Sequence, residues 1–208
     1  TGNGPLQFPV ITGPCTVISD QSSCESSPIL GLWSTPNTCI TSGLTIDVED
    51  SVKINSGINL TIFNTIDNSG TLINSGDIDD QGNLLTEIGG TLINSGSITI
   101  INTAYITNAG GTITNNSGGS ITNNSGSFSN NSGTFDNYGL IVIYGNPGLS
   151  NGSTFNNNGT VDINGTITNS GTLNNHGTLN NTSGSFIVNN NEIQNFGTIT
   201  NDGTITNN

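Results

Sequence analysis

The sequence predicts an all-β protein, a parallel β-solenoid (β-helix) of short units, six to seven residues long, behind a small N-terminal head. Two observations support this prediction. Asn, Gly and Thr (36, 29 and 30 residues) make up nearly half of the 208 residues, and all three are poor helix formers. From about Ile54 onward a unit recurs: Thr or Ser, an apolar residue, any residue, Asn, one or two small polar residues, and Gly. Because this period is regular, we favour order over low-complexity disorder.

Each unit predicts one short strand and one corner. Clear copies are Thr-Ile-Thr-Asn-Ser-Gly at 166–171 and Thr-Leu-Asn-Asn-His-Gly at 172–177. Strand side chains alternate between two sides, so the apolar residue points inward and the Thr residues beside it point outward. The Asn and Gly residues suit corners that need a positive φ. We expect the core to contain the apolar members of the units, which are Ile113, Ile121, Phe128, Phe135, Ile167, Leu173, Leu179, Phe186, Ile193, Ile199 and Ile205.

One unit cannot bury its single apolar side chain, so about three units should close a coil and successive coils should stack in parallel. At about 18 to 21 residues per coil, residues 44–208 predict about eight or nine coils and a rod on the order of 40 Å long. The Asn two places after the apolar residue shares its inward side. It either forms amide ladders along the axis or serves only as a turn former. The runs 139–148 and 185–197 are longer and more apolar, which predicts longer strands or bulged corners there.

The first 43 residues differ in composition from residues 44–208, and we interpret them as a separate head. They hold all three cysteines and the only tryptophan. Cys15, Cys24 and Cys39 predict one disulfide plus one buried or intermolecular thiol, with the pairing open; a zinc site is the rival and has no fourth ligand. The segment 5–11 is apolar and interrupted by proline, which suits an edge strand or an assembly arm. The apolar residues of this arm are Pro5, Leu6, Phe8, Val10 and Ile11.

Charge excludes several classes of function. Lys53 is the only basic residue apart from His176, and the net charge is −13. A nucleic-acid partner is excluded, because phosphate contacts need Lys or Arg. Membrane insertion is not expected, because the sequence has no run of about 18 apolar residues. The chain starts at Thr1 and contains no Met, which is typical of an exported protein whose leader has been removed, so we expect a secreted, extracellular or cell-surface location.

Nine Asn residues lie in Asn-x-Ser/Thr triplets, the acceptor sequence of N-glycosylation. An Asn/Thr/Ser repeat also produces such triplets by composition, so we expect modification of some sites and not of all. The candidates are Asn59, Asn115, Asn123, Asn130, Asn151, Asn158, Asn164, Asn180 and Asn181.

Enzymatic chemistry has little support in the sequence. His176 occupies a repeat position where equivalent units carry Ser or Asp, so we interpret it as a solvated corner residue. No cofactor is expected, with calcium as the one candidate. Asp77, Asp79, Gln81 and Gly82 follow the spacing of a calcium loop, but the acid at its end, Glu87, falls one residue short. A surface calcium ion held by Asp77, Asp79 and Asp80 competes with the interpretation that these are solvated acids.

The passage Leu-Thr-Ile-Asp-Val-Glu-Asp that begins at Leu44, with the serial Gly-Thr-Ile-Thr-Asn-Asn-Ser-Gly units after it, resembles a known group. It is similar to the Asn/Gly/Thr-rich β-strand-repeat surface proteins of archaea and bacteria, which include haemagglutinin-like adhesins. The resemblance covers residues 44–208. It implies an extracellular, rod-like and non-catalytic role, either structural or adhesive.

Three functions are therefore expected, in order of preference. The first is a structural subunit that stacks head to tail with copies of itself into a filament, with the arm at 5–11 or the first coil covering the last coils of the next copy. The second is a stalk or adhesin that binds surface glycans. The third is ice binding through outward Thr-x-Thr pairs, as at Thr112/Thr114 and Thr166/Thr168.

Overall fold

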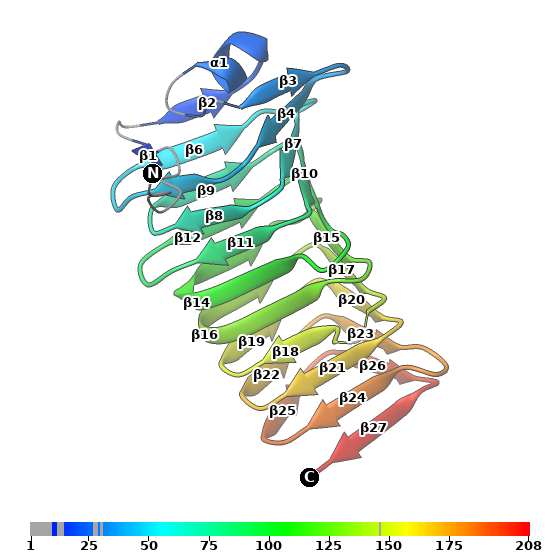
Figure 1. Ribbon diagram of the computed structural model, residues 1–208. Coiled ribbons are helices and arrows are strands. Elements are labelled where there is room, and N and C mark those ends of the chain that lie inside the picture. The colour runs from blue at the N-terminus through cyan, green and yellow to red at the C-terminus, as the bar shows by residue number, and fades with distance from the viewer. Residues whose placement is uncertain (1–9, 12–14, 27–28, 30, 146) are drawn as a thin grey trace, which may run out of the picture.

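The computed structural model describes residues 10–11, 15–26, 29, 31–145 and 147–208. Figure 1 shows short strands stacked along one axis as a β-solenoid of about eight turns, with β2 (Thr16–Ile18) and β27 (Thr204–Asn207) at opposite ends. Turns are about 20 residues long. The predicted all-β parallel solenoid is confirmed, and so is the predicted size of its repeat.

Each turn contributes one strand to each of three faces. Face 1 is a ten-stranded sheet of β3 (Leu32–Ser34), β4 (Thr38–Thr41), β7 (Asn59–Ile62), β10 (Asp77–Asp80), β13 (Ser97–Ile100), β15 (Ser120–Asn123), β17 (Leu140–Ile143), β20 (Thr160–Ile163), β23 (Thr178–Asn181) and β26 (Thr198–Asn201). Face 2 consists of β1 (Val10–Ile11), β5 (Leu44–Ile46), β8 (Thr65–Asn68), β11 (Asn83–Thr86), the first halves of β14 (Tyr105–Asn115) and β16 (Ser127–Asn137), β18 (Leu149–Asn151), β21 (Thr166–Asn169), β24 (Phe186–Asn189) and β27 (Thr204–Asn207). Face 3 consists of β2 (Thr16–Ile18), β6 (Ser51–Ile54), β9 (Thr71–Asn74), β12 (Thr91–Asn94), the second halves of β14 and β16, β19 (Thr154–Asn157), β22 (Thr172–Asn175) and β25 (Glu192–Asn195).

The core follows the two-residue alternation of the strands. In most four-residue strands the second and fourth side chains are buried, and the first and third lie outside. Seven of the predicted core residues are fully buried: Ile113, Ile121, Phe128, Phe135, Ile167, Leu173 and Leu179. Ile193 and Ile199 are partly buried against the core, and Ile205, in the last strand, is 42% exposed. Phe135 stacks on Phe155 of the next turn with ring centroids 4.8 Å apart, so aromatic packing continues along the axis.

The prediction for Phe186 is wrong. Phe186 pairs with Thr166 and Thr204, which are outward residues, and is 46% exposed, whereas Ile187 is buried. The corner before β24 spans four residues (182–185), so the strand begins at Phe186. The repeat pattern would begin it one residue earlier, at Ser185. A slip of one residue exchanges the two sides of a strand.

The two runs were expected to form longer strands or bulged corners, and neither forms a longer strand, although the first run ends in a five-residue corner (144–148). Residues 140–143 and 186–189 are ordinary four-residue strands, and 192–195 is a further ordinary strand on the next face. The long strands are β14 and β16, 11 residues each, which continue around the corner between faces 2 and 3. Their pairing shifts register around Ala109, and glycines at positive φ, Gly110 and Gly133, make that extended corner possible.

Stacked asparagines form ladders inside the solenoid. On face 3 each Asn donates from Nδ2 to the Asn Oδ1 one turn further on, at 2.7–2.8 Å, through Asn74, Asn94, Asn115, Asn137, Asn157, Asn175 and Asn195. On face 2 the same bonds, at 2.6–2.9 Å, join Asn108, Asn130, Asn151, Asn169, Asn189 and Asn207. The amides also bind the corners, as when Asn157 donates to the Thr178 carbonyl at 3.0 Å. The ladder interpretation of these asparagines is therefore the correct one.

The head is joined to the first turn of the solenoid. The helix α1 (Gln21–Glu25) is capped by Asp20, whose side chain accepts a hydrogen bond from the Ser23 amide. Cys24 of this helix is bonded to Cys39 of β4, and Cys15 is a free, exposed thiol. This disulfide leaves Cys24 and Cys39 unable to serve as zinc ligands. Because β4 pairs in parallel with β7, residues 38–41 of the predicted head already belong to the first turn.

The predicted assembly arm is described only at Val10 and Ile11. These residues form β1, which pairs in parallel with Thr45 and Ile46 of the same chain. Pro5, Leu6 and Phe8 lie outside the described residues. The described part of the arm therefore has a partner within its own chain.

Candidate functional site

The acidic cluster does not converge on one point. Strand alternation in β10 places Asp77 and Asp79 on the outer side and Asp80 in the core. Asp79 accepts a hydrogen bond from Asn59 Nδ2 at 2.7 Å, across to the previous turn. Within the described residues, no group of three or more His, Cys, Asp or Glu side chains could hold a metal ion. Asp80 therefore cannot join Asp77 and Asp79 in the expected surface calcium site, because its carboxylate faces the opposite side of the strand. Calcium binding by Asp77 and Asp79 stays a prediction.

Asp80 occupies a core position that carries Ile in both adjacent turns, at Ile62 and Ile100, and Asn in some turns further along, such as Asn123. Its Oδ1 accepts a hydrogen bond from the Gly82 amide, and its Oδ2 is buried without a hydrogen-bond partner. Burial raises the pKa of Asp80 to about 7, and the Gly82 bond opposes this shift. At mildly acidic pH the Asp80 carboxyl group is therefore protonated and uncharged, like the Asn side-chain amide that occupies this position in some other turns.

Burial sorts the nine glycosylation candidates into two groups. Five of them point into the core, which are Asn115, Asn123, Asn130, Asn151 and Asn181. Asn158 and Asn164 are exposed at corners, and Asn59 and Asn180 are half-buried on the outer side of face 1. A glycan could reach only the second group in the folded chain, because the ladder amides of the first group are enclosed by neighbouring turns.

The outward threonines form a column, but the expected pairs are scattered. Thr112/Thr114 lie on face 3, Thr166/Thr168 and Thr204/Thr206 on face 2, and Thr198/Thr200 on face 1. The first strand position of face 3 is nevertheless Thr in six consecutive turns, at Thr71, Thr91, Thr112, Thr134, Thr154 and Thr172. The neighbouring outward column carries Ile73, Ile93, Thr114, Asp136, Asn156 and Asn174. The Thr column is regular, and the column beside it is not.

His176 lies on the corner between faces 3 and 1. Its ring stacks on Phe196 of the next turn, with centroids 4.8 Å apart and planes inclined by 13°. Both side chains are exposed. This arrangement agrees with the interpretation of His176 as a corner residue.

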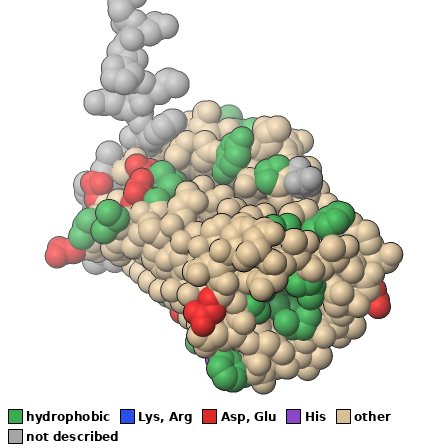
Figure 2. All heavy atoms as spheres, turned by 90° about the horizontal axis from the view of Figure 1, so that it is seen from below, with side chains coloured by type: hydrophobic (Ala, Val, Ile, Leu, Met, Phe, Trp, Pro, Cys, Tyr) green, Lys and Arg blue, Asp and Glu red, His purple; other side chains and the backbone are tan. Residues whose placement is uncertain are grey.

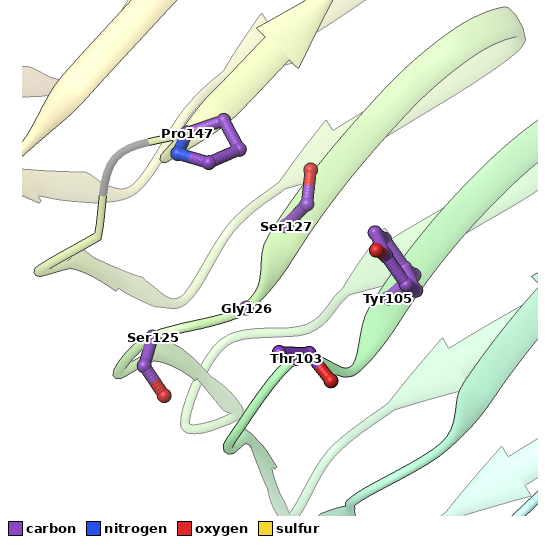
Figure 3. Close-up of a pocket in the computed structure, with 6 residues that line it drawn as sticks. All are labelled: Thr103, Tyr105, Ser125, Gly126, Ser127 and Pro147. Atoms are coloured by element: carbon purple, nitrogen blue, oxygen red, sulfur yellow. The ribbon is translucent and has the colours of Figure 1, made fainter.

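A small cleft lies at the corner between faces 1 and 2 (Figure 3). Its volume is about 110 Å³, and it is lined by Thr103, Tyr105, Ser125, Gly126, Ser127 and Pro147. These residues come from three successive turns. The corners differ in length: four residues (101–104), then three (124–126), then five (144–148). The short middle corner therefore lies between two longer ones, which makes the surface concave. Sequence reasoning missed this cleft, and the unequal corner lengths are the signal that could have shown it.

A second hollow, of about 350 Å³, lies near the N-terminal end of face 1. It is lined by Leu32, Ile40, Ser42 and Phe63. Leu32 and Phe63 are 71% and 50% exposed. The walls of this hollow are mainly apolar.

Comparison with known proteins yields no match: no protein-family model, no curated protein and no solved structure matches this chain. The structure thus supports the solenoid fold, and the resemblance to surface proteins stays a prediction. Among the described residues, no helix has the length and apolar character needed to cross a membrane.

Proposed function

We propose that this chain is an extracellular structural protein, a β-solenoid rod that associates head to tail with copies of itself into a filament. The β-solenoid fold is typically structural. The Cys24–Cys39 disulfide supports an oxidising location outside the cytosol. We propose no enzymatic activity, because the one histidine stacks on a phenylalanine and the acidic cluster is split between two sides of a strand.

The observation that carries this proposal is that the rod has matching strand edges at its two ends on faces 2 and 3, whereas face 1 ends on the N-terminal side in β3, which pairs antiparallel with β4. Among the described residues, β1 and β2 at the N-terminal end each pair on one side only, with β5 and β6. At the other end, β27 and β25 pair on one side only, with β24 and β22. β1 and β27 belong to face 2, and β2 and β25 belong to face 3. A second copy stacked head to tail therefore continues both faces with parallel strands.

The side chains of the last turn add an apolar contribution. Figure 2 looks at the rod from its C-terminal end and shows apolar side chains in the middle of that surface, framed by polar atoms. Ile205 points to the inner side of β27 and is 42% exposed, and Ile199 is partly buried. Burial of such side chains against another turn releases about 25 cal/mol per Å². Exposed strand edges also bind further strands through their free backbone groups.

The symmetry of this contact determines whether the assembly is a closed ring or an open filament. Contact between two different ends is heterologous and does not close on itself, so it generates a filament. The chain carries 14 acidic residues and one lysine, so copies repel one another at low salt. Association should therefore strengthen as the salt concentration rises toward about 0.15 M, where the Debye length is about 8 Å.

Electron microscopy and sedimentation velocity of the purified 208-residue chain test this proposal. We expect fibres of uniform width at high protein concentration. Ile205→Lys should abolish them by placing a charge in the contact, and Thr206→Lys, which adds the same charge on the outer side of the same strand, should leave them intact. A wild-type chain that stays monomeric at high concentration and salt would overturn the proposal, as would equal effects of the two variants.

Ice binding is a second candidate, because the six-turn Thr column on face 3 is regularly spaced. A thermal hysteresis measurement tests it. Activity that is lost in Thr112→Lys and kept in Thr168→Lys, on face 2, would support ice binding through face 3. An inactive wild-type chain would remove this candidate.

A further inference from the structure

The outer side of strand β17 differs from the rest of face 1. Leu140 and Val142 point outward from this strand. Tyr138 lies at the corner just before it, and Tyr144 lies at the corner just after it. Leu140 and both tyrosines are exposed, and Val142 is half-buried. These four residues, which we call the β17 row, form an apolar stripe across the width of the face.

The neighbouring strands of face 1 are polar on their outer side. β10, β13 and β15 lie before β17 in this sheet, and β20, β23 and β26 lie after it. Figure 1 shows β15, β17, β20 and β23 following one another along the rod. The outward side chains of the six neighbouring strands are Asp77, Asp79, Ser97, Thr99, Ser120, Thr122, Thr160, Asp162, Thr178, Asn180, Thr198 and Thr200. An apolar stripe within a polar surface indicates an interaction site.

A second copy of this chain provides a surface of matching size. The seven strands from β10 to β26 are centred on β17. With strands about 4.8 Å apart and a row about 20 Å long, this part of the face covers about 650 Å². Two copies packed face to face would bury about 1,300 Å² in total, and specific interfaces bury about 1,200–2,000 Å². The area is therefore sufficient for a stable pair.

The acidic residues of the face determine how the second copy is oriented. Two arrangements with two-fold symmetry place one β17 row against the other. If the rods are parallel, each strand faces its own counterpart, so Asp77 and Asp79 of the two copies meet. Like charges that meet across an interface are costly. The parallel arrangement is therefore disfavoured.

The antiparallel arrangement avoids this contact between like charges. Strands at equal distances on the two sides of β17 then face each other, so β10 faces β26 and β20 faces β15. Asp77 and Asp79 lie opposite the outward threonines of β26. Asp162 lies opposite Thr122. Threonine hydroxyl groups can donate hydrogen bonds to carboxylates, so the outward carboxylates of these seven strands all meet neutral donors.

We propose that two copies of this chain pair side by side through face 1, with the rods antiparallel and the two β17 rows in contact. The contact is isologous, because both copies use the same surface, and it closes as a dimer. It uses the outer side of face 1, whereas the end-to-end contact proposed above uses the strand edges of β1, β2, β25 and β27. Each contact can therefore form without the other. Between filaments, the side-by-side contact would join two that run in opposite directions.

Sedimentation velocity of the Ile205→Lys chain tests the pairing. This variant is designed to block the end-to-end contact, so fibres do not obscure a dimer. We expect a reversible equilibrium between monomer and dimer that shifts toward dimer as the protein concentration rises.

Two matched substitutions in the Ile205→Lys chain locate the contact. Val142 is the third residue of β17, and Val188 is the third residue of β24 on face 2; both are half-buried and point outward. Val142→Lys should raise the dissociation constant of the dimer about tenfold or more, because it buries a charge without a partner. Val188→Lys adds the same charge outside the contact and should leave the constant unchanged. Circular dichroism shows whether each variant is folded.

A distance measurement distinguishes the two orientations. A nitroxide spin label is attached at Thr200→Cys in the Ile205→Lys chain, with Cys15→Ser to remove the free thiol. β26 is the third strand after β17 in face 1, so in the antiparallel dimer the two labels lie six strand spacings apart along the rod. Pulsed electron paramagnetic resonance should therefore give a distance of about 30 Å, compared with about 10 Å for parallel rods.

Three results would overturn the proposal. These are an Ile205→Lys chain that stays monomeric at its highest soluble concentration, equal weakening of the dimer by Val142→Lys and Val188→Lys, and a label distance of about 10 Å. Failure of the end-to-end proposal is a separate result, because it is measured as the absence of fibres in the wild-type chain.

Discussion

At the scale of single residues, the inner corners of the solenoid depend on amides. A buried amide costs free energy unless its hydrogen bonds are made, and the ladders make them along the axis. Asn157 accepts a bond from Asn137 and donates to Asn175 and to the Thr178 carbonyl. Thr86 breaks the face 2 ladder, and Thr86 Oγ1 and the neighbouring Asn68 Oδ1 are buried without hydrogen-bond partners. The ladder is therefore strongest where the sequence repeats Asn without interruption.

Asn157→Ala tests the contribution of one ladder member. It removes three hydrogen bonds inside the rod and leaves their partners unsatisfied, so we expect a loss of about 3 kcal/mol in the free energy of unfolding. Asn156→Ala is the control on the same strand, because Asn156 points outward and water can replace its bonds to Asp136 and Asn174. Its cost should stay below about 1 kcal/mol. Urea unfolding measures both, and equal costs would contradict a special role for the ladder.

Asp80→Asn tests the buried carboxyl group. The pKa of Asp80 is raised from 3.8 to about 7, so the folded chain binds a proton that the unfolded chain has already released. The stability contributed by this group is complete below about pH 4 and is lost as the pH rises through about 7. The loss amounts to about 4 kcal/mol at most, from about 1.36 kcal/mol per pKa unit. The Asn variant should therefore be more stable than the wild type at about pH 8.

Urea unfolding of both chains across this pH range separates the effect of Asp80 from that of the other acidic groups, which the two chains share. The difference in stability between wild type and variant should grow between about pH 4 and pH 7 and then stay constant. A difference that is constant over the whole range would show that Asp80 is not the titrating group.

At the scale of the strand, alternation decides which substitutions the fold accepts. β21 carries Ile167 and Asn169 inward and Thr166 and Thr168 outward. Ile167 pairs with Leu149 on one side and Ile187 on the other, so three apolar side chains stack along the axis. Replacing either inward residue affects the turn above and the turn below.

Ile167→Asp should destabilise the chain by about 4 kcal/mol or more, because it combines a lost apolar side chain with an unpaired buried carboxyl group. Thr168→Asp changes the outward neighbour and should alter stability by about 0.5 kcal/mol or less. Thermal unfolding followed by circular dichroism measures both. Similar melting temperatures for Ile167→Asp and wild type would show that the strand register is wrong.

At the scale of the whole molecule, each turn contacts only its neighbours. The strand pairs are almost all between one turn and the next on the same face. Stability should then be a sum over turns and their interfaces. The head differs, because the Cys24–Cys39 disulfide and the helix α1 join it covalently and by packing to the first turn.

Deletion of residues 198–208 tests this additivity. The variant lacks β26 and β27, which cover β23 and β24, and ends on the complete turn of β23, β24 and β25. We expect it to fold with the same type of β spectrum and to lose only the free energy of one partial interface. Global unfolding of the shortened chain would show that the solenoid behaves as a single cooperative unit instead.

The sequence by itself determined the solenoid, its repeat of about 20 residues, the inward apolar residues and the position of the ladder asparagines. These follow from a local period, because each unit fixes its own strand, corner and alternation. The tertiary structure decided the inward position of Ile187 in place of Phe186, the pairing of Cys24 with Cys39 and the separation of Asp80 from Asp77 and Asp79. It also created the Tyr105 cleft, which exists only where corners from three turns lie side by side. Corner lengths vary by one to three residues, and their effect on register and on surface shape appears only when turns are stacked.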